Sequence, residues 1–128
     1  MKCQITTHVL DLIKGTPANN IPAVLEKLNN SESWEAIGNG TTNDDGRIEK
    51  LLGEGDTISS GTYRLTFDVT SYFESQQSDS FYSSIPIIFN ITNTSRHYHI
   101  PLLLSRFGYS TYGEVKKWNG IKFLNSLI

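Results

Sequence analysis

The clearest strand pattern in this chain is Tyr63-Arg64-Leu65-Thr66-Phe67-Asp68-Val69. Its apolar and polar residues alternate, so an extended segment would bury one face and expose the other. Comparable short segments lie before and after it, bounded by clusters of Gly, Pro, Asn, Asp or Ser. We predict strands over residues 5–11, 24–28, 34–37, 47–48, 63–69, 85–91, 97–104 and 109–112.

Turn signals recur between these strands every ~8–15 residues, as in small all-β proteins. The strongest is Asn43-Asp44-Asp45-Gly46, because Asp-Gly supplies the positive φ that tight turns need. One short helix is predicted over residues 71–77, which contain neither Gly nor Pro. Pro86 lacks an amide N–H and therefore favours a sheet edge or a strand start for residues 85–91. The whole pattern indicates an all-β sandwich or barrel.

Length and composition restrict the class of protein. With 128 residues, the chain is expected to form one domain, and proteins of this size often complete a modest core by oligomerising. The net charge of −2 gives no electrostatic reason to expect nucleic acid or an anionic membrane as a partner. No stretch approaches the ~18 apolar residues of a membrane span. The single cysteine, Cys3, and the lack of a signal-peptide pattern favour a reducing, cytoplasmic location.

Two longer segments of the chain carry specific motifs. They are His8-Val9-Leu10-Asp11-Leu12-Ile13-Lys14-Gly15-Thr16-Pro17-Ala18 and Tyr98-His99-Ile100-Pro101-Leu102-Leu103-Leu104-Ser105, continuing through Phe107-Gly108-Tyr109-Ser110-Thr111-Tyr112. These segments resemble the signature motifs of the transthyretin-like family, and Asp45-Gly46-Arg47 and Gly61-Thr62-Tyr63 fall between them at family-like spacing. The resemblance covers about residues 3–112.

The resemblance implies a sandwich of two four-stranded sheets with one short helix, assembled as a homotetramer around a central channel. Within the family, His8, Arg47 and His99 match the 5-hydroxyisourate hydrolases, whereas carrier members have residues such as Lys and Thr there. The resemblance therefore implies that the chain hydrolyses 5-hydroxyisourate to 2-oxo-4-hydroxy-4-carboxy-5-ureidoimidazoline in urate degradation, without a metal or cofactor. The active sites would lie between the dimers of the tetramer, and no nucleic acid or membrane partner is expected.

Two histidines and one arginine suit the opening of a cyclic amide. Histidine has an ordinary pKa of about 6.5 and can activate water or protonate the leaving nitrogen. A planar guanidinium can hold a carbonyl oxygen while negative charge develops on it. We expect His99 or His8 to activate water, the other histidine to orient substrate or shuttle protons, and Arg47 to stabilise the oxyanion. Tyr112, a residue of the second motif, is expected to bind substrate with them.

Other interpretations remain open at this point. His97 and His99 would share one face of a strand, a spacing that also suits zinc. No nearby Asp, Glu or Cys completes an obvious ligand set, so we expect His97 to support the site without binding metal. One alternative function is a carrier that binds a small aromatic ligand in the same channel. Another is a catalytically impaired relative whose apolar tail docks elsewhere.

The tail departs from the family pattern. Hydrolases of this family end in Tyr-Arg-Gly-Ser, which contributes to the active site, but here Tyr112 is followed by Gly113-Glu114-Val115 and the chain continues to Ile128. Either of two accounts would explain this change: read-through past an exon end, or a divergent enzyme with weakened activity. We predict a hydrolase domain over residues 1–112 and an atypical extension over residues 113–128, whose apolar residues fit a short amphipathic helix.

The resemblance permits the cytosol or the peroxisome, because purine breakdown uses both. The last residues, Asn125-Ser126-Leu127-Ile128, do not form a Ser-Lys-Leu peroxisomal signal. The cytoplasm is therefore the expected location.

Overall fold

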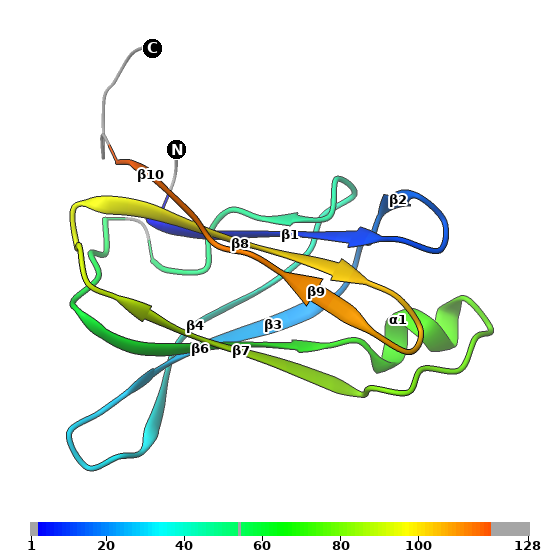
Figure 1. The fold of residues 1–128 in the computed structure, drawn as a ribbon, viewed down its shortest axis with the longest axis horizontal. Coiled ribbons are helices and arrows are strands. Elements are labelled where there is room, and N and C mark those ends of the chain that lie inside the picture. The colour runs from blue at the N-terminus through cyan, green and yellow to red at the C-terminus, as the bar shows by residue number, and fades with distance from the viewer. Residues whose placement is uncertain (1–2, 54, 119–128) are drawn as a thin grey trace.

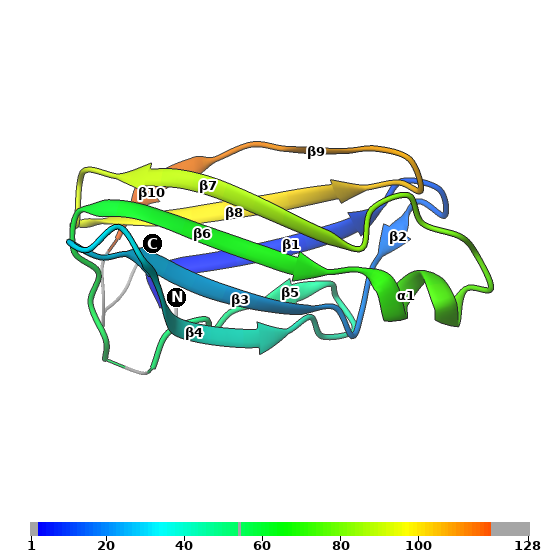
Figure 2. The same cartoon turned by 90° about the horizontal axis from the view of Figure 1, so that it is seen from below.

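The computed structural model describes residues 3–53 and 55–118, which form two β-sheets packed face to face (Figures 1 and 2). This arrangement confirms the predicted all-β sandwich. The elements are β1 (Ile5–Asp11), β2 (Thr16–Pro17), β3 (Pro22–Leu28), β4 (Trp34–Thr41), β5 (Arg47–Ile48), β6 (Gly61–Asp68), α1 (Thr70–Ser75), β7 (Ser84–Ile91), β8 (Arg96–Leu104), β9 (Tyr109–Thr111) and β10 (Glu114–Lys117).

One sheet has the strand order β4-β3-β6-β7 and is antiparallel throughout. Its edge strand β7 contains Pro86, which agrees with the predicted edge position. The other sheet follows the order β10-β8-β1-β2, and the short strands β5 and β9 also pair with β1 and β8. β1 and β8 run parallel although they come from opposite ends of the described chain. Parallel strands need a crossover connection, and here the whole first sheet is inserted between them.

The core lies between the sheets and is built from alternate residues of each strand. On β6, Tyr63, Leu65 and Phe67 are at most 1% exposed, whereas Arg64 and Thr66 face outward. Alternate residues of β8, Ile100 and Leu102, are buried from the opposite sheet. Burying a large apolar side chain contributes about 1.5–3 kcal/mol, so the alternation that predicted the strands also fixes which face turns inward.

The short helix α1 follows β6, close to the predicted range. It buries Tyr72 and Phe73, and the Tyr72 hydroxyl donates a hydrogen bond to the carboxylate of Asp11 at the end of β1. Burial and the contact with Asp11 raise the pKa of Tyr72 well above its usual range. Among residues 3–53 and 55–118, no helix has the length and apolar character needed to cross a membrane.

The beginning of the tail is a strand rather than the start of the predicted helix. β10 pairs antiparallel with the first half of β8, with Glu114 opposite His99 and Lys116 opposite His97. Without β10, the backbone N–H and C=O groups along this edge of β8 would lack hydrogen-bond partners. The need to pair these groups outweighs the weak helical pattern of the sequence. Most of the apolar residues on which the helix prediction was based fall within residues 119–128, which lie outside the described residues.

Candidate active site

Polar residues from four strands lie on the outer face of the six-stranded sheet. Side chains alternate along a strand, so His97 and His99 of β8 share a face, as do Thr6 and His8 of β1. The register places Thr6 beside His99, and His8 beside Arg47 of β5. Directly paired residues project to the same side of a sheet. The fold therefore brings His8, Arg47 and His99, the three residues predicted from the motifs, to one face.

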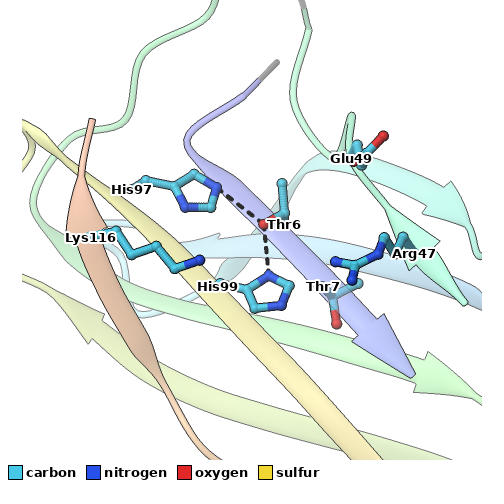
Figure 3. A pocket seen from close by; sticks show the side chains of 7 residues that line it. All are labelled: Thr6, Thr7, Arg47, Glu49, His97, His99 and Lys116. Carbon is cyan, nitrogen blue, oxygen red and sulfur yellow. Dashed lines mark hydrogen bonds between the residues drawn. The ribbon is translucent and has the colours of Figure 1, made fainter. Parts of the chain in front are cut away.

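A pocket of about 270 Å³ opens on this face (Figure 3). Ligand pockets commonly span ~300–1,000 Å³, so this one suits a compact molecule. The pocket contains Arg47 and His99, whereas His8 flanks it beside Arg47. Its lining residues are Thr6, Thr7, Arg47, Glu49, His97, His99 and Lys116.

Thr6 holds the two histidines of β8 in place. Its hydroxyl lies 2.8 Å from Nδ1 of His99 and 3.1 Å from Nε2 of His97 (Figure 3). The imidazole rings are nearly parallel, with centroids 6.4 Å apart. Because a hydroxyl can donate one hydrogen bond and accept others, Thr6 can donate to one ring and accept from the other. This bridge leaves Nε2 of His99, on the far side of the ring from Thr6, as the nitrogen that can exchange a proton with a ligand.

His8 is fixed by the turn that precedes Arg47. Its Nε2 donates a hydrogen bond of 2.9 Å to the backbone carbonyl of Asp45. A carbonyl oxygen only accepts, so Nε2 carries the hydrogen and Nδ1 of the neutral ring is the acceptor. Burial lowers the pKa of His8, and the neighbouring Arg47 guanidinium lowers it further.

His99 is also held in its neutral form. Burial is the largest cause that lowers its pKa, followed by the charge of Lys116, with smaller contributions from Arg47 and His8. The carboxylate of Glu114 acts in the opposite direction. A neutral imidazole at neutral pH can accept a proton, so the site provides a general base.

His97 lies deeper than His99 and is only 3% exposed. Burial, then the charges of His99 and Lys116, lower the pKa of His97 to about 4. Its ring stacks on Trp118 at a centroid distance of 6.0 Å, and its Nδ1 has no hydrogen-bond partner among the described residues. Within residues 3–53 and 55–118, no three His, Cys, Asp or Glu side chains are grouped as metal ligands would be.

Tyr112 is not brought into this pocket. Tyr112 is 54% exposed and lines a separate groove of about 280 Å³, which His99 also lines. The sequence reasoning also missed four residues that line the pocket, Thr6, Thr7, Glu49 and Lys116. Thr6 could have been found from its i, i+2 relation to His8 on a predicted strand, whereas the position of Lys116 depends on the register of β10, for which the sequence holds no signal.

Comparisons with known proteins agree with this fold. The model of the HIUase/Transthyretin family matches residues 5–113. The chain is 43% identical to the 5-hydroxyisourate hydrolase of Salmonella dublin over 108 residues, which cover 84% of this chain and 78% of that protein. It is 38% identical to the 5-hydroxyisourate hydrolase of Mus musculus over 109 residues, which cover 84% of this chain and 92% of that protein.

Among solved structures, sea bream transthyretin in complex with thyroxine superposes with a TM-score of 0.83 at 32% identity. The match covers 89% of this chain and 97% of that one. A family match over most of the sequence, with the same sandwich in a solved relative, leaves one conclusion. The chain belongs to the HIUase/transthyretin family.

Proposed function

We propose that this chain hydrolyses 5-hydroxyisourate, as the names of its relatives from Salmonella dublin and Mus musculus suggest. The observation that carries the proposal is the convergence of His8, Arg47 and His99 on one face of the sheet, around a small polar pocket. The substrate is a compact, polar heterobicycle with a ring amide that neighbouring carbonyl groups activate. The pocket size and its polar lining suit such a molecule.

In the proposed mechanism, His99 is the general base, because it lines the pocket while His8 flanks it. Neutral His99 takes a proton from water as the water oxygen attacks the amide carbonyl carbon. The carbonyl oxygen becomes an oxyanion, which the Arg47 guanidinium stabilises. The carbon–nitrogen bond then breaks, the imidazolium returns its proton to the leaving nitrogen, and a carboxylic acid is formed. His8 orients the substrate beside Arg47.

We also propose a homotetramer with its active sites at the interface between dimers. Two observations support this assembly. The pocket opens on an outer sheet face, so a second subunit could enclose it and exclude water. Large apolar side chains are exposed on the single chain, among them Leu12, Phe107 and Tyr112.

The test is a spectroscopic assay of the decay of freshly generated 5-hydroxyisourate, with and without the purified chain. We expect the chain to accelerate decay and His99→Ala to reduce kcat/KM by ~10²–10⁴-fold, the usual contribution of a general base. Arg96→Gln on the same strand is a control, because Arg96 is exposed at the start of β8, outside the pocket. Unchanged turnover in His99→Ala would remove His99 from the mechanism.

The same preparation separates the hydrolase from the carrier alternative. Sea bream transthyretin was solved in complex with thyroxine, so thyroxine is the probe for binding. Tight thyroxine binding without any acceleration of 5-hydroxyisourate decay would favour the carrier and contradict the proposed function.

A further inference from the structure

We propose that Lys116 is a substrate-binding residue of this site, whose ammonium group holds an oxygen-bearing edge of the substrate opposite the edge held by Arg47. The inference rests on the proposed function and identifies the class of ligand more closely: a compact heterobicycle with carbonyl oxygens on opposite edges. Lys116 lies outside residues 5–113, which the family model matches, so this contact would be a feature of this chain rather than of the family pattern.

The strand order places Lys116 and Arg47 on opposite sides of the pocket. The pairings give the order β5-β1-β8-β10, so Arg47 reaches the pocket from one flank and Lys116 from the other, with His99 between them. Figure 3 shows the Lys116 side chain extending from β10 toward His99, with Arg47 beyond the histidine. A ligand seated over His99 would therefore meet a cation at each end.

The register of β10 selects Lys116 rather than its neighbour Lys117. Lys116 pairs with His97 and shares the pocket face, and side chains alternate along a strand. Lys117 pairs with Arg96 and projects to the other face. The chain therefore supplies two adjacent lysines on one strand, of which only the first lines the pocket.

Among the residues that the structure describes, Lys116 forms no ion pair with another residue that lines the pocket. The charged residues that line the pocket are Arg47, Lys116 and Glu49. The Lys116 ammonium lies 3.7 Å from the carboxylate of Glu114, but the side chains in this pair are 51% and 45% exposed. Exposed pairs of this kind interact weakly in water, so the ammonium remains available for a ligand. The same positive charge lowers the pKa of both His97 and His99.

The proposed reaction places negative charge where these two cations can reach it. Ring opening of an amide puts negative charge on the carbonyl oxygen in the transition state and leaves a carboxylate in the product. One cation can stabilise this oxygen while the other fixes a carbonyl at the far edge of the ring. Since a charge-assisted hydrogen bond is stronger than a neutral one, removing either cation weakens ligand binding measurably.

The test compares Lys116→Gln with Lys117→Gln, a matched control of the same residue type on the same strand. Both variants are assayed for kcat/KM on 5-hydroxyisourate and for the Kd of urate, a stable bicyclic probe, by NMR titration of the full chain. We expect Lys116→Gln to lower kcat/KM and weaken urate binding by ~10–100-fold, mainly through KM. Lys117→Gln should stay within about twofold of the unmodified chain, and Lys116→Arg should restore most of the loss.

A pH profile provides a readout that a merely structural role would not change. Because Lys116 lowers the pKa of His99, Lys116→Gln should move the acidic limb of the kcat/KM profile toward higher pH, and Lys117→Gln should not. The other charged or titratable groups facing His99 are unchanged in this comparison: His8, Arg47, Glu49, His97 and Glu114.

The outcomes separate this inference from the proposed function. An unmodified chain without turnover would contradict the proposed function, while the urate titration would still decide the role of Lys116. Equal urate Kd values for Lys116→Gln and Lys117→Gln would overturn the inference, whether or not the chain is a hydrolase. In an active chain, equal kcat/KM values for the two variants would overturn it as well.

Discussion

At the scale of single residues, the hydroxyl of Thr6 supports the site by positioning the proposed base. Thr6 reaches both imidazoles of β8, at 2.8 Å from His99 and 3.1 Å from His97, and so sets the orientation of the proposed base. Its direction of donation also determines which ring nitrogen of His99 carries a hydrogen. If the base were misoriented or in the wrong tautomer, the chain would bind substrate normally but convert it slowly.

Thr6→Val tests this positioning role, because valine keeps the shape of threonine and removes its hydroxyl. We expect kcat to fall by about tenfold with little change in KM, since the substrate contacts remain while the base loses its orientation. Thr66→Val on the outer face of the other sheet is the control and should leave both constants unchanged. A rise in KM at constant kcat would show instead that Thr6 binds the substrate.

The buried His97 gives the stability of the fold a defined pH dependence. Its pKa is about 4 in the folded chain and about 6.5 when unfolded, so between these values the unfolded state binds more protons. The free energy of unfolding should therefore fall as the pH is lowered from 6.5 to 4, and this contribution should be constant above pH 6.5. Urea unfolding of the chain and of His97→Gln across this range measures it. An equal slope in both proteins would contradict the assignment.

The sequence predicted part of this site through local motifs. His8, Arg47 and His99 were identifiable because each lies within a motif or beside a turn that resembles the family's. Lys116 was not, because its place in the pocket depends on which residue of β10 pairs with His97. Tyr112 belongs to the same motif as His99 but lies outside the pocket, because it follows the end of β9 and lines a separate groove.

At the scale of elements, the alternation of apolar and polar residues predicted the strands that bury one face. It missed strand segments whose structure depends on the segments that they pair with or pack against. β1, β6 and β8 follow the predicted ranges within one or two residues. β4 was expected to end near residue 37 but extends to Thr41 through Gly38 and Gly40. A Cβ atom at Gly38 would lie 1.7 Å from the backbone oxygen of Leu51. Glycine is thus required there by a distant segment, although its propensity argues against a strand.

Asp11 connects the end of β1 with α1 and the following turn. Its buried carboxylate accepts hydrogen bonds from the Tyr72 hydroxyl and from the amide groups of Ile13 and Lys14. We expect Asp11→Ala to lower the free energy of unfolding by about 1–3 kcal/mol, because the buried Tyr72 hydroxyl loses its acceptor. Urea denaturation measures the change, with the exposed Asp56→Ala as control. A loss equal to that of the control would show that the three bonds contribute nothing.

At the scale of the whole molecule, the parallel pairing of β1 with β8 is what builds the site. The two family motifs lie at opposite ends of the described chain, and this pairing sets His8 and His99 on neighbouring strands of one face. The remaining sheet supports that face through the shared core. A single chain leaves the pocket open to solvent, and a second subunit would cover it in the proposed tetramer.

The proposed homotetramer makes a simple prediction about mass. Size-exclusion chromatography with light scattering should give a mass four times that of one chain, which the burial of exposed apolar residues such as Leu12 and Phe107 would favour. Dilution to a monomeric form should reduce the specific activity, because the open pocket would admit water. A fully active monomer would contradict the proposed position of the active sites at a subunit interface.

The most direct test of the central claim is a double-mutant cycle on Arg47 and His99, followed by the rate of 5-hydroxyisourate decay. If both residues act on one substrate in one pocket, each single change (Arg47→Gln or His99→Ala) should reduce kcat/KM by at least ~10²-fold, and the double variant should lose much less than the product of the two. A loss of kcat/KM in the double variant equal to the full product of the two single losses would contradict the shared site. A rate in either single variant equal to that of the unmodified chain would contradict it as well.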